Sequence, residues 1–449
     1  MTGTMGFKGK VFLISLGCAK NLVDSEHMLG LLTRDHFRIV QRIEDADFAL
    51  INTCGFIQAA VEESIEAILE VSRQKKAGTL KGLFVMGCLV QRYGYKLRKE
   101  MPEVDGWLGT GEIHRIVDIL SERKGSQGPS LLIGTPGFLA DHSVPRIQAT
   151  PFYTAYLKIA EGCFHKCSYC MIPRLRGPFR SRELDSLVSE ARQMVDRGVK
   201  EINLIAQDTT LYGADLGKSI CLEDLLETLL KIQGMSWIRI LYAHPHGISD
   251  RLLNLIDTEE TICPYLDIPL QHVNQQILKA MGRASEEENP WQLIERIKSG
   301  TRRISLRTTV MVGFPGETDE VFGELYDFVD KTAFEHLGAF VFSPEKGTAA
   351  ARLGGAVERG MAEKRRVAIM KLQSRISQRK NQMLVGHILP VLIEGESPET
   401  SLLLKGRTAT MAPDIDGQVL INRGYGSVGE IAGVLITEAH PYDLVGEIT

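Results

Sequence analysis

The sequence predicts an α/β protein of three parts: an N-terminal α/β domain with a parallel sheet, a partial (β/α) barrel, and a small antiparallel β-barrel. Three observations predict it. The length of 449 residues exceeds what one compact core usually holds. Strand-like runs alternate with helical stretches through the first two parts, as in parallel sheets. The C-terminal part instead carries short β-like runs and glycine turns.

The N-terminal domain is expected over residues 8–124. Buried strands are predicted at 11–16, 48–52 and 83–86. A helix is predicted at 61–73, where Ile65, Ile68 and Leu69 share one face. Glycines and prolines then mark a linker over residues 125–148.

The barrel is expected over residues 149–380. Its six predicted strands cover 155–160, 201–206, 237–242, 265–268, 305–312 and 336–342. Helical spacers separate most of them, and a charged helix at 361–380 closes the region. In such barrels the functional site lies at the carboxyl ends of the strands, so these ends are where chemistry is expected.

The C-terminal barrel is expected over residues 382–449. Its predicted strands cover 388–393, 417–421 and 434–436. This part has nine acidic and three basic residues, a net charge of −6, whereas the whole chain carries −4. Small barrels often bind RNA, but this one is predicted to repel phosphates and to attract a basic partner.

Membrane and secretion signals are not found in the sequence. No run of about 18 apolar residues occurs, and the apolar run at 11–16 is too short for a signal peptide. A cytoplasmic protein without a membrane partner is therefore predicted. In that compartment clustered cysteines are more often metal ligands or catalytic groups than disulfides.

The strongest local signal is a C-x3-C-x2-C motif made by Cys163, Cys167 and Cys170, directly after the first barrel strand. Thiolates suit iron–sulfur clusters. Three of them on a four-iron cluster leave one iron open, which can bind the amino and carboxylate groups of S-adenosylmethionine (SAM). The alternatives are a zinc knuckle or a redox dithiol. Zinc usually needs a second ligand pair about 12–20 residues on, but the next cysteine, Cys221, lies further away and is unpaired.

A second set of cysteines is dispersed along the N-terminal domain. Cys18, Cys54 and Cys88 each follow a predicted strand, and each has a glycine beside it. Open parallel sheets bind ligands at the carboxyl ends of their strands, so the three thiols are expected to meet in one metal site. From the residues alone, three buried structural cysteines are an equally good interpretation. Cys221 and Cys263 have no partners by pattern and are predicted to be small buried apolar residues.

Several motifs resemble the methylthiotransferase family of radical SAM enzymes, over nearly the whole chain. The run from Ser15 to Glu26, SLGCAKNLVDSE, is similar to the branch that modifies ribosomal protein S-twelve, whereas branches acting on tRNA typically carry Gln-Met-Asn after the cysteine. Four further runs also resemble the ribosomal branch: NTCGFI at 52–57, PLQH at 269–272, GFPGET at 313–318 and APDIDG at 412–417.

The resemblance implies the roles of the cysteines and the reaction. Cys18, Cys54 and Cys88 would hold an auxiliary [4Fe-4S] cluster in a methylthiotransferase N-terminal domain. Cys163, Cys167 and Cys170 would hold the radical SAM [4Fe-4S] cluster, and the last part would be a TRAM domain. One SAM would donate a methyl group and another would supply the radical, adding a methylthio group to the β-carbon of an aspartate in ribosomal protein S-twelve. The implied partners are that protein or the small ribosomal subunit, an electron donor and a sulfur donor.

Further residues are candidates for contact with SAM. Tyr169 could touch the adenine, or be a packing aromatic. Gly313 and its neighbours could run along SAM, or form a plain turn. Gln207 and Asp208 could contact SAM or substrate, or cap the next element. Three histidines at predicted strand ends are expected to be hydrogen-bonded wall residues rather than metal ligands: His244, His246 and His272.

Two other functions remain open from the sequence. The same chemistry on a tRNA adenosine would be favoured by a basic terminal domain, and this one is acidic. A metal-binding or RNA-binding scaffold without activity is the other alternative. Two three-cysteine sets, each leaving a free coordination site, argue against a closed structural metal.

Overall fold

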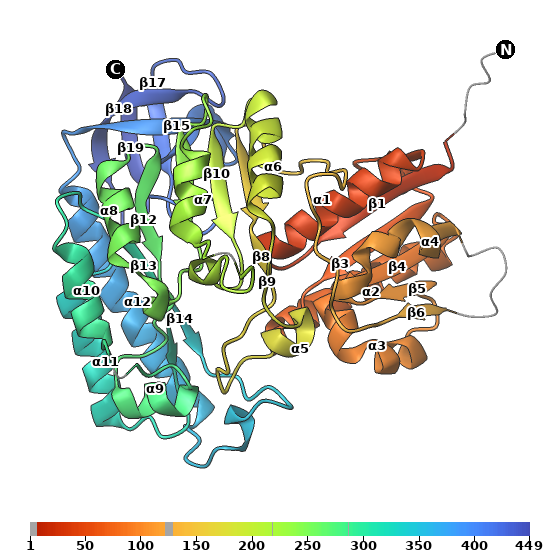
Figure 1. The fold of residues 1–449 in the computed structure, drawn as a ribbon, viewed down its shortest axis with the longest axis horizontal. Helices are drawn as coiled ribbons and strands as arrows, with labels where there is room; N and C mark the ends of the chain where they lie inside the picture. The colour runs from red at the N-terminus through yellow and green to blue at the C-terminus, as the bar shows by residue number, and fades with distance from the viewer. Residues whose placement is uncertain (1–6, 122–128, 218, 286) are drawn as a thin grey trace.

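The structure, a computed structural model, describes residues 7–121, 129–217, 219–285 and 287–449. Figure 1 shows the red-to-orange N-terminal domain beside a yellow-to-cyan barrel, with a small blue barrel packed against the latter. Among the described residues no helix is long and apolar enough to cross a membrane. The predicted fold class is confirmed.

The N-terminal domain is built on a six-stranded parallel sheet in the order β2-β1-β3-β4-β5-β6. Its strands are β1 (Gly9–Ser15), β2 (Phe37–Ile39), β3 (Phe48–Thr53), β4 (Gly82–Gly87), β5 (Gly106–Leu108) and β6 (Ser130–Leu132). β1, β3 and β4 are the predicted strands. The other three have three residues each, too few to show a period in the sequence. β6 lies within the stretch predicted as a linker.

Helices cover both faces of this sheet. They are α1 (Ala19–Arg34), α2 (Gln58–Lys76), α3 (Cys88–Glu100) and α4 (Ile116–Ser121), with short 3-10 turns η1 (Ile43–Asp45) and η2 (Thr110–Arg115). α1 and α4 pack on one face and α2 and α3 on the other. The predicted helix lies within α2, but Leu69 is 44% exposed and does not belong to its buried face. That face is formed by Val61, Ile68 and Val71, because Leu69 is rotated about 100° from Ile68.

The central barrel has a six-stranded parallel sheet, as predicted, and its strands lie in the order β14-β13-β12-β11-β10-β7. Its strands are β7 (Thr154–Lys158), β10 (Glu201–Ile205), β11 (Trp237–Ile240), β12 (Ile262–Asp267), β13 (Ser305–Val312) and β14 (His336–Val341). The helices around it are α6 (Leu184–Asp196), α7 (Leu222–Leu229), α8 (Asp250–Thr258), α9 (Gln275–Met281), α10 (Pro290–Lys298), α11 (Asp319–Thr332) and α12 (Arg359–Gln382). Alternate strand residues pack against these helices in the largest apolar core of the chain.

Shorter elements surround the carboxyl ends of the barrel strands. They are β8 (Ala160–Glu161), α5 (Ile172–Arg176), β9 (Arg180–Ser181), η4 (Thr209–Leu211), η5 (Pro245–Gly247) and η6 (Ala350–Arg352). β8 and β9 form a two-stranded antiparallel pair that frames the segment between them. This segment contains the C-x3-C-x2-C motif.

The C-terminal part is a closed five-stranded barrel in the order β15-β16-β17-β19-β18. Its strands are β15 (Ile388–Ser397), β16 (Thr400–Thr408), β17 (Val419–Arg423), β18 (Ile431–Ala439) and β19 (Leu444–Ile448). Four of the strand pairs are antiparallel, whereas β17 and β19 run parallel. The predicted small β-barrel is therefore found, with one parallel pair inside it.

This small barrel is joined to the central barrel by buried charges. Arg407 donates to Glu201 of β10 at 2.7 Å, and Arg239 of β11 donates to the same carboxylate at 2.9 Å. The exposed fractions of Arg239, Glu201 and Arg407 are 0%, 0% and 3%. Asp416 accepts from Tyr265 at 2.7 Å and pairs with Arg307 at 3.3 Å. Glu394 pairs with Arg407 at 2.7 Å. Two of the nine acidic residues of the C-terminal barrel, Asp416 and Glu394, are thus neutralised by ion pairs inside the fold.

We expect Glu201→Ala to destabilise the protein by about 3–5 kcal/mol, because it removes the carboxylate that two buried guanidiniums share and leaves Arg239 without an ion-pair partner among the described residues. Burial raises the pKa of Glu201, but Arg407 and Arg239 lower it to about 2. A depressed pKa contributes stability above the unfolded value of about 4.3, and that contribution is lost as the pH falls towards 2. Urea unfolding at pH 7 measures the loss. Glu44→Ala, which breaks the exposed Arg42–Glu44 pair, is the control and should leave the midpoint unchanged.

Candidate metal centres and the surface between them

The three dispersed cysteines lie at the carboxyl ends of β1, β3 and β4, which are neighbours in the sheet. Cys54 directly follows β3, Cys88 directly follows β4, and Cys18 precedes the first residue of α1. The Cys18 thiol raises the pKa of Cys54, and both of these thiols raise the pKa of Cys88, so the three side chains lie close together. Gly17 has a φ of +93°, and a Cβ there would lie 2.9 Å from the Cβ of Cys54. Only glycine therefore allows this close approach.

The C-x3-C-x2-C segment forms a loop between β8 and α5. Its start is fixed by Cys163 N–H, which donates to the carbonyl of Gly177 at 3.2 Å. Its middle is fixed by Ser168, whose N–H donates to the carbonyl of Met281 at 2.9 Å. Cys170 N–H donates to the carbonyl of Cys167 at 3.1 Å. The loop therefore lies at the carboxyl end of the barrel, where the sequence predicted it.

The spacing of the sulfurs bears on whether a single zinc ion could bind to either triad. In the described residues, the one group of three His, Cys, Asp or Glu side chains whose ligand atoms all lie within 4.8 Å of one another contains no cysteine. A tetrahedral zinc ion with Zn–S bonds of about 2.3 Å needs sulfurs about 3.8 Å apart. Neither cysteine triad meets this need, although all eight cysteines are free thiols. The sulfurs of each triad are thus spread more widely than one tetrahedral zinc ion requires.

Burial disfavours the thiolate form of most of these cysteines unless a metal ion binds them. It raises the pKa of Cys163 to about 11 and that of Cys170 to about 12. Burial also raises the pKa of Cys88 to about 12, although Arg176 lowers it. Cys18 differs: desolvation raises its pKa, but Lys20 and Arg176 lower it by more. A metal that binds thiolates would displace the protons.

The two triads are joined by one short helix. α5 starts two residues after Cys170, and Met171 and Leu175 pack directly against Cys88. Five residues of helix span roughly 8 Å, so the two sites are near neighbours in space. The loop of one triad forms part of the wall of the other.

Arg176, the last residue of α5, is the centre of a buried polar network beside the dispersed triad. Its guanidinium donates to Asp24 at 2.6 Å, to Glu161 at 3.2 Å and to the side-chain oxygen of Asn21. The Asn21 amide donates to the carbonyls of Leu16 and Thr53, both at 2.9 Å. Asn21 therefore ties the loops of Cys18 and Cys54 to the barrel.

A second contact closes the interface on the side of Cys54. Arg92 of α3 donates to the carbonyl of Gly55 at 2.9 Å and to Glu345 at 2.8 Å. Glu345 belongs to the loop after β14, and it also accepts from the N–H of Gln58 at 3.1 Å. Arg92 and Glu345 are both buried. Two buried ionic contacts thus fix the N-terminal domain against the barrel.

The candidates for SAM contact have structural partners of their own. Tyr169 packs in an apolar cluster with Phe314. Gln207 donates to Glu161 at 2.7 Å, and its buried oxygen has no partner in the described part of the chain. Gly313 has a φ of +76°, and a Cβ there would lie 2.4 Å from the Cβ of Ala362 on α12. Close packing explains this glycine, and its contact with SAM stays a prediction.

A histidine inside the cysteine motif was missed as a site residue by the sequence reasoning. His165 Nε2 lies 2.6 Å from a carboxylate oxygen of Asp208, and its ring stacks on His244 at 3.9 Å between centroids. His246 meets His244 edge-on. Burial lowers the pKa of His244, as do Arg283 and His165. The ligand atoms of His165, Asp208 and His244 all lie within 4.8 Å of one another, a spacing that could hold a metal ion, so a wall role for His244 stays a prediction. Its position between two cysteines of the motif could have identified His165 as a site residue from the sequence.

The other predicted residues have plainer roles. Asp208 caps η4 by accepting from Thr210 N–H at 2.9 Å. His272 accepts from two backbone N–H groups through Nδ1, at 2.9 and 3.0 Å. Cys263 is buried, as predicted. Cys221 is not: it is half-buried at the start of α7, where its N–H donates to Asp224 at 2.9 Å. The apolar residues of α7 begin after Cys221, so the cysteine lies at the edge of the apolar core and is only partly covered.

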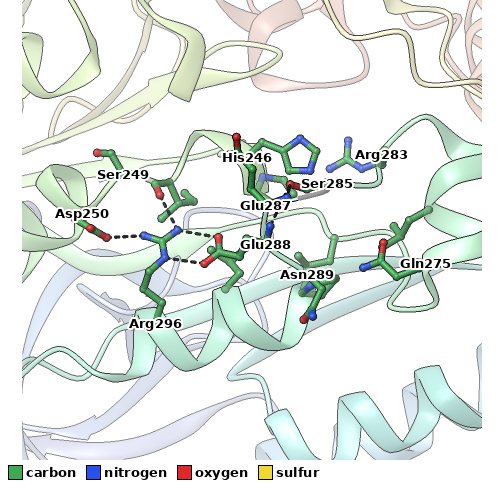
Figure 2. Close-up of a pocket in the computed structure, with 16 residues that line it drawn as sticks. His246, Ser249, Asp250, Gln275, Arg283, Ser285, Glu287, Glu288, Asn289 and Arg296 are labelled. Carbon is green, nitrogen blue, oxygen red and sulfur yellow. Dashed lines mark hydrogen bonds and ion pairs between the residues drawn. The ribbon is translucent and has the colours of Figure 1, made fainter.

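A cavity of about 350 Å³ lies beside the cysteine loop. Figure 2 shows Arg296 on one of its walls, bonded to Asp250 and Glu288. Arg283 and His246 line the cavity on the side away from Arg296. Arg283 also reaches Cys167, with 3.7 Å between its guanidinium nitrogen and the sulfur. The cavity therefore adjoins the cysteine loop without containing it.

Three family models match the chain, one in each part. They are described as uncharacterized protein family UPF0004 over residues 10–109, the radical SAM superfamily over 157–329 and the TRAM domain over 385–449. The relative in Geotalea uraniireducens, named ribosomal protein uS12 methylthiotransferase RimO, is 50% identical over 98% of both chains. Proteins of the same name in Pelobacter propionicus and Geobacter sulfurreducens are 48% identical over 98% of this chain and 98% and 99% of their own.

The chain belongs to the ribosomal protein uS12 methylthiotransferase family. It is a radical SAM methylthiotransferase, and the resemblance found in the sequence is confirmed.

Solved structures agree with this family in fold. The radical SAM methyltransferase TsrM of Kitasatospora setae matches with a TM-score of 0.53 at 14% identity, over 74% of this chain and 72% of its own. The cobalamin-dependent radical enzyme OxsB matches with a TM-score of 0.50 at 13% identity, over 81% of this chain and 56% of its own. At these identities the likeness concerns the fold alone.

Proposed function

We propose that this methylthiotransferase adds a methylthio group to the β-carbon of an aspartate in uS12, the ribosomal protein S-twelve. The observation that carries the proposal is the 48–50% identity to relatives of that name over nearly the full length of both chains. Residues 8–124, 149–380 and 382–449 would form the auxiliary-cluster, radical SAM and TRAM units.

The six clustered cysteines are the residues we assign to cofactors. Cys18, Cys54 and Cys88 would hold the auxiliary [4Fe-4S] cluster, and Cys163, Cys167 and Cys170 the radical SAM [4Fe-4S] cluster. When bound, these clusters and SAM supply an electron, a 5′-deoxyadenosyl radical and transferable sulfur. The chain itself positions the two sites. α5 links them, and the buried contacts of Arg176 and Arg92 hold the two domains together.

The C-terminal barrel supports a basic protein as the substrate. Five of its acidic residues are exposed: Glu396, Glu399, Asp414, Glu430 and Glu438. Its three cations include Arg407, which is buried in an ion pair. A surface of this charge attracts a basic protein and repels the phosphates of tRNA, the alternative substrate. A reaction on the ribosome also requires an electron donor and a sulfur donor in the cytoplasm.

We expect a uS12 mass gain of one methylthio group when the reconstituted enzyme is incubated anaerobically with SAM, a reductant and uS12. The same mixture with tRNA should give no gain, because the acidic barrel disfavours RNA. Intact-protein mass spectrometry and nucleoside analysis measure the two products. Modification of tRNA alone would reject the substrate, while the methylthiotransferase assignment would stand.

A further inference from the structure

Three segments of the barrel meet around Ser168, the residue after Cys167. The Ser168 hydroxyl donates to the carbonyl of Ala280 at 2.8 Å, at the end of α9. Its carbonyl accepts from Ala350 N–H at 2.8 Å, at the start of η6. The Arg174 guanidinium lies against Gly347, so closely that a Cβ on Gly347 would be 2.6 Å from it. Residues 163–176, 277–284 and 343–353 therefore form one continuous surface.

This surface is strongly cationic in a chain whose net charge is −4. The three segments contain seven lysines and arginines and a single acid, Glu345. Arg176, Arg283 and Glu345 are buried and serve the contacts described above. The other five cations are exposed, and no ion pair within the described residues neutralises them. These five form the cationic collar: Lys166, Arg174, Lys279, Lys346 and Arg352.

The collar lies beside the cysteine loop at Cys167. Lys166 directly precedes Cys167, and Lys279 directly precedes Ala280, which binds the Ser168 hydroxyl. Cys167, like Cys163 and Cys170, is half-buried. The small barrel and its buried charges close the opposite end of the barrel. An external protein can therefore approach the Cys163, Cys167 and Cys170 site at the collar.

We propose that the cationic collar is the docking surface for an acidic one-electron carrier protein. The inference rests on the proposed role of Cys163, Cys167 and Cys170. In this step one electron leaves the carrier and reduces the cluster that these cysteines hold, and no bond or proton changes place. A positive surface speeds and orients the approach of an acidic partner. It repels the basic substrate, which leaves the collar free while uS12 is bound.

Ribosomal RNA is the other polyanion that could meet this surface. The observations favour the carrier, because the cations gather around a cysteine ligand rather than along an extended stripe. Leu353, exposed to 41%, also lies next to Arg352. An apolar residue within a charged rim is typical of a protein interface.

The test uses the holoenzyme and a strongly acidic flavodoxin as the probe. The collar variant is Lys279→Glu/Lys346→Glu/Arg352→Glu. The control variant, Lys231→Glu/Lys371→Glu/Arg379→Glu, makes the same change in charge at exposed positions elsewhere. Two quantities are measured at low salt: the Kd for oxidised flavodoxin, which needs no catalysis, and SAM cleavage driven by reduced flavodoxin. SAM cleavage driven by dithionite reports whether the cluster itself is intact.

The collar variant should bind flavodoxin at least tenfold more weakly and lose flavodoxin-driven cleavage, with dithionite-driven cleavage and iron content unchanged. The control variant should resemble the unmodified enzyme, whose flavodoxin affinity should fall as salt rises. Unchanged flavodoxin binding by the collar variant would overturn the proposal. So would a variant that keeps flavodoxin-driven cleavage but no longer modifies assembled ribosomal subunits, because the collar would then hold RNA. Absence of dithionite-driven cleavage in the unmodified enzyme would instead count against the proposed function.

Discussion

Cys163→Ala is expected to reduce SAM cleavage to the background without enzyme. Cys163 is the first ligand of the C-x3-C-x2-C loop, whose backbone is fixed by Gly177 and Met281. The loop therefore cannot shift to offer a substitute, and the two remaining thiols cannot hold a four-iron cluster. Iron after anaerobic reconstitution should fall from about eight to about four per chain. Production of 5′-deoxyadenosine with SAM and dithionite measures the loss.

The matched control for this variant is Cys221→Ser. It also removes a thiol from the central barrel, but one that only starts α7, and serine is a good residue for a helix start. Iron content and SAM cleavage should therefore match the unmodified enzyme. SAM cleavage that persists in Cys163→Ala would contradict the assignment of the radical SAM site. Zinc at one or two ions per chain, without iron, would contradict both cluster assignments.

Cys54→Ala is expected to stop sulfur insertion into uS12 and to leave SAM cleavage in place. Cys54 follows β3 in the N-terminal domain, and the groups that fix the Cys163–Cys170 loop come from the barrel. Losing this thiol should therefore remove the auxiliary cluster without disturbing the other. About four irons per chain should remain, and 5′-deoxyadenosine should still form while uS12 gains no methylthio mass.

The choice of Cys54 over Cys88 matters for this experiment. Met171 and Leu175 pack on Cys88, so a change there could disturb the radical SAM loop directly. Cys54 instead contacts Gly17 and hydrogen bonds with Ser64, both within its own domain. A methylthio gain on uS12 by Cys54→Ala would show that the auxiliary site is not needed. Loss of SAM cleavage would show that the two sites do not work separately.

Much of the fold followed from local patterns. The six barrel strands and the three longer strands of the N-terminal domain were predicted, because buried strands of four or more residues leave a clear apolar signal. The strands β2, β5 and β6 were missed because three residues leave none. The prediction that Leu69 lies on the buried face of α2 was wrong, and its neighbour Ile68 lies there instead. The sequence period alone does not fix which side of a helix faces the sheet.

Candidate ligands could be read from the sequence, because ligand types and their spacing are properties of the chain. It predicted both cysteine triads, their strand-end positions and the acidic C-terminal barrel. How these parts meet follows from their packing in three dimensions. Three contacts join residues that lie far apart in the chain. α5 packs against Cys88, Arg407 pairs with Glu201, and the segments that carry the five cations meet around Ser168. Such contacts depend on how helices and sheets pack, and they leave no periodic trace in one sequence from which they could be predicted.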